Sequence, residues 1–464
     1  MENNTIWINV TTSRNWTRPA VGIVRVEREL VAGLKKKYPQ SAVKLCAWQG
    51  DGFVMVDSEF PDAEQGPGGQ VGQHSPPALS MSVMPKRQAV IAIAQGIHSL
   101  LPHKLRPVYL ASLATVKPFA KRMAGKLHAM RTHKKIRTVA SADASRASPL
   151  PLPGVSRSSC SHPFQAGDIL VSVGLDWDWP FYKEFFWLRK NDGVKVVTCC
   201  YDLIPVLYPQ YCVADVANLF SSYFLEIADG SDLIVCISKQ TERDLLQMLD
   251  DVGGPKVKTH VFPLGDNVPG QGGAVSPGVA SLLEQPFILF VSSIERRKNH
   301  EIIYRAYHLL CKAGLSDKLP KVVFVGMQGW GVGDLMKDIE LDPLTRGKIV
   351  RLNHVNDEEL LSLYKASLFC VFPSLYEGWG LPVGEALSLG KVVVASDRGS
   401  LPEVGGDLVI YENPWNATAW AEIIKKLVFD ASFRLDQENK IKSNYAKRTW
   451  SDSVNSVADA LNGL

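Results

Sequence analysis

The second half of the chain alternates short apolar segments with helical patterns, and this alternation constrains the fold more than any other feature. The apolar segments span residues 287–292, 321–326, 349–353, 368–372, 392–396 and 408–411. Short apolar runs bounded by turn residues predict strands that are buried on both faces. Strands that alternate with helices pair in parallel through crossover connections, so we predict a doubly wound α/β domain.

The length of the chain predicts a second domain beside this one. With 464 residues the chain exceeds what one hydrophobic core usually holds. Further strand patterns in the first part cover residues 5–11, 42–48, 53–57, 168–174, 195–200, 232–238 and 259–264. The Gly- and Pro-rich stretch 266–285 is typical of a linker. We therefore expect an N-terminal domain over 1–265 and a C-terminal domain over 286–444.

A glycine-containing turn follows the predicted strand 368–372, and Pro382 is suited to begin the helix after it. Gly378 and Gly380 leave a backbone that a ligand can approach closely. A strand, a Gly-rich turn and a helix N-terminus together favour anion binding, because free N–H groups and the helix dipole face outward. From these residues alone, a structural turn remains the alternative.

Two glutamates flank this turn, Glu377 and Glu385, with seven residues between them. The stretch from Pro373 to Leu387 resembles the Glu-x7-Glu signature of retaining glycosyltransferases of the GT-B fold, in particular glycosyltransferase family 4. The resemblance extends over 286–412 and more weakly over 168–264. It implies two Rossmann-like domains facing a cleft, with the last helix, 445–464, crossing back to the first domain. It also implies that Glu377 contacts the donor sugar and that Glu385 holds the nucleotide ribose.

A basic turn follows the first strand of the C-terminal domain, and it resembles the Arg-Lys-Asn segment of the same family. The resemblance implies that Arg297 and Lys298 hold the donor diphosphate. An arginine fork and a lysine charge suit this task, since the leaving diphosphate gains negative charge as the glycosidic bond breaks. Arg296 stands where many members have proline, and its role is open. A solvated basic turn is the alternative.

The resemblance names further donor-side residues. Asp202 lies in a Tyr-Asp-Leu-Ile-Pro segment that resembles the lining of the donor-sugar pocket. Tyr201 replaces the histidine that many members have before this aspartate, so that histidine's role does not transfer. The remaining predicted donor-binding residues are in glycine turns or near the base: Gly22, Val355, Gly378, Gly380 and Leu381. His354 is expected to be structural.

No metal and no cofactor are predicted. Asp176 and Asp178 have the spacing of a metal-binding Asp-x-Asp pair. They lie in the N-terminal domain, away from the predicted diphosphate contacts, and turn or capping roles are favoured for both. Two cations and a helix N-terminus supply the positive charge that a metal would otherwise bring.

A segment of different character, 58–163, interrupts the first domain. Between Gln65 and Ala142 there are twelve Lys and Arg residues and no Asp or Glu. The same stretch holds apolar runs such as Ala89 to Ala94. It is interpreted either as a flexible solvated insertion or as a basic, partly amphipathic element that binds anionic lipid. Nucleic acid is not favoured, because no aromatic interleaving accompanies the charge.

The remaining sequence features favour a cytoplasmic protein. Its N-terminus lacks the basic and apolar regions of a signal peptide. No apolar run approaches the roughly 18 residues that span a bilayer. The eight cysteines are scattered and no Cys-x-x-Cys pair is present, which indicates reduced thiols.

Together the residues and the resemblance predict a retaining, metal-independent hexosyltransferase. The expected donor is a nucleotide-diphosphate sugar, GDP-linked, that carries mannose or a related hexose such as rhamnose. The expected acceptor is a lipid-linked glycan or oligosaccharide in O-antigen or capsule synthesis, reached from the inner face of the cytoplasmic membrane. A sugar-nucleotide epimerase of the same fold and a non-catalytic scaffold are the alternatives.

Overall fold

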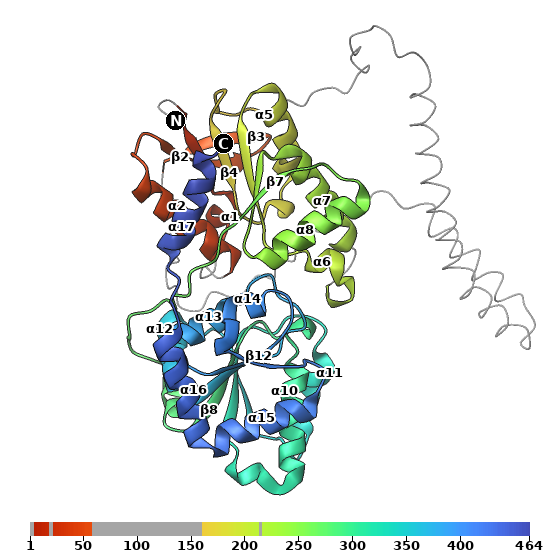
Figure 1. Ribbon diagram of the computed structural model, residues 1–464, viewed down its shortest axis with the longest axis vertical. Helices are drawn as coiled ribbons and strands as arrows, with labels where there is room; N and C mark the ends of the chain where they lie inside the picture. The colour runs from red at the N-terminus through yellow and green to blue at the C-terminus, as the bar shows by residue number, and fades with distance from the viewer. Residues whose placement is uncertain (1–3, 18–21, 58–159, 213–215) are drawn as a thin grey trace, which may run out of the picture. The chain divides into compact units, whose positions relative to one another are not determined.

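The computed structural model describes residues 4–17, 22–57, 160–212 and 216–464, and it contains two β-sheets with helices around them (Figure 1). The predictions made for the basic segment 58–163 lie outside these residues, except for its last four positions.

The first sheet has seven strands in the order β3-β2-β1-β4-β5-β6-β7. Their bounds are β1 Ile6–Asn9, β2 Val43–Gln49, β3 Gly52–Val56, β4 Ile169–Ser172, β5 Lys195–Cys200, β6 Leu233–Cys236 and β7 Lys258–Val261. Neighbouring strands are parallel except β2 and β3, which form an antiparallel hairpin. The turn of this hairpin contains Gly50 at a φ of 62°, a backbone conformation that suits glycine.

The second sheet has six strands, all parallel, in the order β10-β9-β8-β11-β12-β13. Their bounds are β8 Phe287–Val291, β9 Lys321–Val325, β10 Ile349–Leu352, β11 Phe369–Phe372, β12 Val393–Ser396 and β13 Ile410–Glu412. Each predicted strand of this sheet is confirmed within about two residues. The sheet reverses its strand order at β8 and β11, and in open α/β sheets ligands bind at such a switch point.

The helices confirm the α/β class. In the first part they are α1 Thr11–Arg14, α2 Ile23–Lys37, α5 Phe185–Asn191, α6 Ile204–Leu207, α7 Val216–Gly230 and α8 Lys239–Val252. The others are α9 Pro277–Leu283, α10 His300–Leu310, α11 Gly333–Leu341, α12 Asp357–Ala366, α13 Leu381–Ser388, α14 Leu401–Gly405, α15 Ala417–Phe429, α16 Ala431–Asn444 and α17 Trp450–Asn462. Helices lie on both sides of the second sheet, and α10 packs beside α15 (Figure 1).

Three sequence boundaries were wrong, and the first is the end of the strand predicted over 259–264, which stops at Val261 in β7. The first strand was predicted to reach Thr11, but the chain turns into α1 at that residue. The hydroxyl of Thr11 accepts the N–H of Trp48, and the hydroxyl of Thr12 accepts the N–H of Leu175, so both threonines bind neighbouring strand ends. The last helix was predicted to begin at 445, but α17 begins at Trp450, after a capping box at Thr449.

The residues between α16 and α17 are extended because they surround a buried carboxylate. Asp266, which is fully buried in the predicted linker, accepts hydrogen bonds from the Tyr445 hydroxyl at 2.5 Å and from Arg448 Nε at 3.0 Å. The segment that follows Asp266 is not entirely coil, since α9 lies within it and buries Val279 and Leu282.

Helix α17 packs against elements of the first sheet. It lies beside α2 (Figure 1). Lys37 donates to Asn455 at 2.6 Å, and the Ser453 hydroxyl donates to the Pro263 carbonyl at 2.7 Å. The end of the described chain is therefore held against its beginning.

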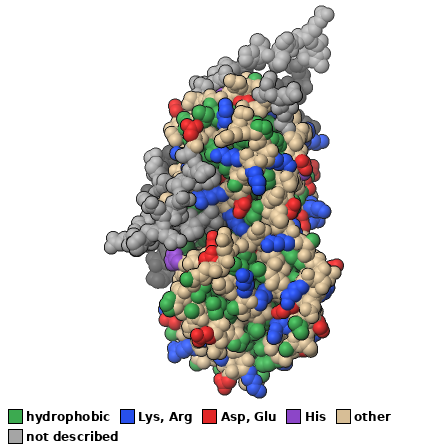
Figure 2. All heavy atoms as spheres, turned by 90° about the vertical axis from the view of Figure 1, so that its left-hand side faces the viewer, with side chains coloured by type: hydrophobic (Ala, Val, Ile, Leu, Met, Phe, Trp, Pro, Cys, Tyr) green, Lys and Arg blue, Asp and Glu red, His purple; other side chains and the backbone are tan. Residues whose placement is uncertain are grey.

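Charge is distributed evenly over the visible surface. On the face in Figure 2 the basic and acidic side chains of the described residues are interspersed. Within those residues, no helix combines the length and the apolar character needed to cross a bilayer.

Candidate active site

The predicted catalytic residues Glu377, Arg297 and Lys298 meet beyond the carboxyl ends of two paired strands. Arg297 and Lys298 are in the 3-10 turn Arg296–Lys298 after β8, and Glu377 follows β11. Lys298 Nζ lies 2.6 Å from Glu377 Oε1, and Arg297 Nη1 lies 2.9 Å from Glu377 Oε2. The two cations therefore bind the two oxygens of one carboxylate.

The clamp formed by these three side chains is buried, and Glu295 beside it completes the balance of charge. Burial alone would raise the pKa of Glu377, but Arg297 and Lys298 outweigh it and lower that pKa to about 2. Burial lowers the pKa of Lys298, against the attraction of Glu377. Burial also disfavours the Arg297 charge, yet Glu377 and Glu295 raise its pKa overall. Glu295, 3% exposed, accepts from Arg297 Nη2 at 2.8 Å.

Glu385 lies on α13 with both of its oxygens engaged. Arg25 Nη1 donates to Oε1 at 3.1 Å, and the buried Tyr364 hydroxyl donates to Oε2 at 3.0 Å. Burial raises the pKa of Glu385, while Arg25 and Tyr364 oppose that rise.

Arg25 is a site residue that sequence reasoning missed. It stands in the first turn of α2, where the helix dipole disfavours a cation. Its side chain is only 12% exposed. A basic residue near a helix N-terminus, three positions after Gly22, was the available signal, because an anion must compensate the charge once it is buried.

Asp202 approaches the clamp from the first sheet, at the end of β5. Its carboxylate accepts the N–H of Ile204 at 3.0 Å. Burial raises its pKa, Arg297 opposes that rise, and Glu377 and Lys298 contribute smaller effects. Tyr201 is 6% exposed, and its hydroxyl donates to the Val173 carbonyl, which directs it into the first sheet.

The glycines of the turn between β11 and α13, Gly378 and Gly380, are explained by packing. A Cβ on Gly378 would lie 2.2 Å from the Tyr201 carbonyl oxygen and 2.9 Å from Asp202 Cβ. Gly380 precedes α13 at a φ of 121°, and a Cβ there would lie 2.6 Å from a methyl group of Leu401. Leu381 is the first residue of α13 and packs partly against the core. Glycine at 378 is therefore what lets Asp202 lie beside the turn between β11 and α13.

Two other predicted donor contacts lie on loop segments. Gly22 caps α2 at a φ of 53°, and a Cβ added to it would have no described atom within 4 Å. Val355 is half-buried against the core, after an exposed His354 at a φ of 58°. Their contacts with a donor stay predictions.

The aspartate pair with metal-like spacing is split by the fold. Asp176 is 1% exposed and accepts from the Ser172 hydroxyl at 2.9 Å, whereas Asp178 is exposed. Glu27, also buried, accepts the Ser13 N–H at 2.7 Å, and burial raises its pKa to about 7. Across the described ranges, no three His, Cys, Asp or Glu side chains gather as a metal site.

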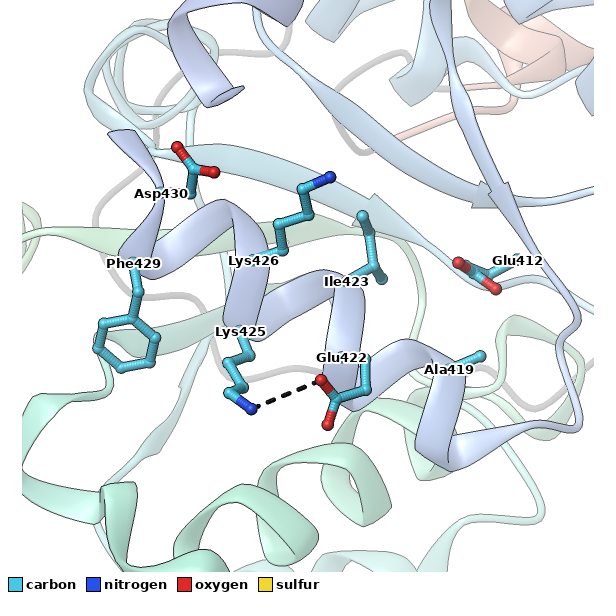
Figure 3. A pocket seen from close by; sticks show the side chains of 8 residues that line it. All are labelled: Glu412, Ala419, Glu422, Ile423, Lys425, Lys426, Phe429 and Asp430. Carbon is cyan, nitrogen blue, oxygen red and sulfur yellow. Dashed lines mark ion pairs between the residues drawn. The ribbon is translucent and has the colours of Figure 1, made fainter. Parts of the chain in front are cut away.

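A hollow of about 690 Å³ lies elsewhere, on the surface of α15 (Figure 3). Its lining is mostly from that helix: Glu412, Ala419, Glu422, Ile423, Lys425, Lys426, Phe429 and Asp430. Glu422 and Lys425 form an ion pair of 3.5 Å along it. It contains no residue of the clamp, so its size is not an argument for a donor site.

The two Rossmann-like sheets define the GT-B class of glycosyltransferase folds. A sucrose-phosphate synthase structure from Thermosynechococcus elongatus matches with a TM-score of 0.56 and 16% identity, over 99% of each chain. At that identity the match supports the fold alone.

The sequence comparisons give the family. Residues 278–448 match the family model of glycosyl transferases group 1. The O-antigen chain mannosyltransferase B of Escherichia coli is 30% identical over 54% of this chain and 68% of that protein. The chain belongs to this family of glycosyltransferases. The serotype-specific mannosyltransferase WbdA of Escherichia coli is 28% identical over 58% of this chain, and the match spans only 34% of that relative's length.

Proposed function

We propose that this protein is a retaining hexosyltransferase that transfers mannose or a closely related hexose from a GDP-linked donor to a glycan acceptor. The observation that carries the proposal is the clamp, in which Arg297 and Lys298 converge on Glu377 at 2.9 and 2.6 Å. Two cations held at a sheet's switch point match the negative charge of a nucleotide diphosphate.

The names of the relatives support the choice of sugar and pathway. Both Escherichia coli relatives are named as mannosyltransferases, and one is named for O-antigen chains. We infer mannose as the first sugar to test and a lipid-linked O-antigen or capsule glycan as the acceptor. The proposed location is the cytoplasm, at the inner face of the membrane, with the basic segment as the membrane contact.

In the proposed mechanism the clamp acts on the leaving group. Negative charge develops on the diphosphate as its bond to the sugar breaks, and Arg297 and Lys298 are positioned to stabilise it. The N-terminal end of the α13 dipole adds partial positive charge to the same region. Glu377 and Asp202 orient the donor sugar, and Glu385 anchors the ribose. This charge arrangement requires no metal ion.

The test is nucleotide release from a panel of GDP-, UDP- and dTDP-sugars, with membrane extract as the acceptor source. We expect release from GDP-mannose only when acceptor is present, and an α-linked product that retains the donor configuration. Conversion of the sugar nucleotide without acceptor would instead indicate an epimerase. Release from none of the donors would contradict the proposed function.

A further inference from the structure

The N-terminus of α8, a helix beside the first sheet, is capped by a carboxylate from α14, a helix beside the second sheet. Glu403 accepts the N–H of Lys239 at 2.9 Å and that of Gln240 at 3.3 Å. The Ser238 hydroxyl caps the N–H of Thr241 at 2.9 Å. Three N–H groups that have no partner within the helix are thereby satisfied, two of them by a residue more than 160 positions away.

The same short helix, α14, holds the backbone of the catalytic turn, which is the segment between β11 and α13 that contains Glu377. Ser400, directly before α14, donates its N–H to the Glu377 carbonyl at 3.1 Å and its hydroxyl at 3.0 Å. Gly399 packs so closely on Glu377 that a Cβ would lie 2.4 Å from that carbonyl oxygen. Glu403 follows Ser400 by one helical turn, so α14 connects the start of α8 to the backbone of Glu377.

A second connection between α8 and the catalytic turn runs through Tyr376. Its hydroxyl donates to Asp244 Oδ2 at 2.5 Å and accepts from Gln240 Nε2 at 3.1 Å. Its carbonyl accepts from Arg297 Nη1 at 2.8 Å. Thr241 adds a hydrogen bond to the Gly378 carbonyl at 3.3 Å. The residues on both sides of Glu377 are therefore bonded to the first turn and a half of α8.

We propose that Glu403 is a positioning residue, which uses the N-terminus of α8 to fix the backbone of Glu377 and hence the clamp. Tyr376 is the second member of this link. The carboxylate of Glu403 binds the amides of Lys239 and Gln240, so its effect on the clamp passes through α14 and Ser400. This inference rests on the proposed function only for its kinetic consequence, because the structural link is measurable without any reaction.

The test compares Glu403→Ala, Glu403→Gln and Tyr376→Phe with the parent by amide hydrogen exchange. Asp407→Asn, an exposed carboxylate on the neighbouring turn, is the matched control. In Glu403→Ala we expect roughly tenfold faster exchange at Lys239 and Gln240, because a lost cap exposes these amides. Exchange should also accelerate at Ser400, whose N–H binds Glu377. Glu403→Gln keeps one acceptor oxygen and should be intermediate.

The kinetic arm uses GDP-mannose with membrane extract, and GDP alone as the binding probe. Glu403→Ala should lower kcat by about tenfold while GDP affinity changes by less than about threefold, since misplaced catalytic groups affect chemistry more than binding. Unchanged exchange at Ser400 would overturn the link. Faster exchange with parental kcat would overturn the positioning role. A parent that transfers nothing but shows the exchange pattern contradicts the proposed function and leaves the link supported.

Discussion

Arg25 and Glu385 form an ion pair between positions 360 residues apart, and it joins the first long helix of the chain to the second glutamate of the Glu-x7-Glu signature. The pair is 3.1 Å long, and its side chains are 12% and 6% exposed. Tyr364 binds the other oxygen of Glu385. The orientation of Glu385 therefore depends both on Tyr364, from its own half of the chain, and on Arg25, from the helix α2 beside the first sheet. The ribose contact proposed for Glu385 therefore includes Arg25.

Replacing Arg25 with Met should weaken donor binding and destabilise the protein. Glu385 would stay buried without its cation, so its pKa, already raised by burial, should rise further. We expect a loss of about 2 kcal/mol in unfolding free energy and weaker binding of GDP. Denaturant titration and calorimetry measure these. Lys36→Met, exposed on the same helix, is the control. If Arg25→Met bound GDP with parental affinity, the ion pair between Arg25 and Glu385 would not be part of the donor site.

Replacing Lys298 with Ala should lower turnover by roughly 10²-fold, because the removed charge is aimed at the developing negative charge of the leaving group. Initial rates with GDP-mannose are the measurement. Lys312→Ala, an exposed lysine in the same half of the chain, should behave like the parent. If turnover stayed within about threefold of the parent, the turn Arg296–Lys298 would not stabilise the leaving group.

Glu27 gives a pH dependence of stability with a defined sign. Burial raises its folded pKa from 4.5 to about 7, so the folded state binds more protons than the unfolded state between these values. Glu27 therefore makes the unfolding free energy fall as pH rises from 4.5 to about 7, by up to ~3 kcal/mol. Urea titrations of the parent at pH 5 and pH 8 should show this loss.

Glu27→Gln should keep an acceptor for the Ser13 N–H and remove the titration. Its stability should be less dependent on pH than that of the parent across this window, whereas Glu284→Gln, an exposed control, should follow the parent. Identical pH profiles for the parent and Glu27→Gln would show that Glu27 ionises normally in the folded protein.

Chelation of divalent metals should leave transfer intact. In the proposed mechanism Arg297 and Lys298 meet the charge on the leaving group, and EDTA does not remove them. Initial rates with and without EDTA test this. Complete loss with EDTA, followed by recovery with manganese, would overturn the charge argument for the clamp.

Deleting residues 65–142 should release the protein from anionic vesicles without abolishing transfer to a soluble acceptor analogue. The twelve cations of this segment each contribute up to about 1 kcal/mol near an anionic surface. Salt should release the full-length protein only partly if apolar residues of the segment insert. Equal vesicle binding by both forms would favour a solvated insertion. Phosphatidylcholine vesicles without anionic lipid are the control.

The sequence was sufficient for the elements whose pattern is strong and local. The strands of the second sheet are mostly continuous apolar runs, with Arg351 in β10 as an exception, and the structure places all six within about two residues of prediction. Glu377, Arg297 and Lys298 come together because they follow β11 and β8, which are paired strands. Helix α16 was missed because its apolar residues are few and unevenly spaced, with Ile441 as its buried residue.

Contacts that depend on both sheets could not be predicted from the sequence. The partner of Glu385 is Arg25, and no local pattern connects residues so far apart. The reason for Gly378 is the Tyr201 carbonyl, which is a packing contact and not a turn requirement. Asp176 has metal-like spacing, yet its side chain turns toward Ser172 because the chain enters a 3-10 turn at this point.

Because Glu377 pairs with both Arg297 and Lys298, the clamp already contains an anion before any ligand binds. The four charged side chains Glu295, Arg297, Lys298 and Glu377 sum to a formal charge of zero, so the site without donor does not present two bare cations to phosphate in solution. If the clamp is the donor site we propose, an incoming nucleotide competes with Glu377 for these cations, which favours ligands that offer more contacts than a lone phosphate. When the nucleotide product departs, Glu377 can take back both cations, and release is then easier than from a pair of unneutralised charges.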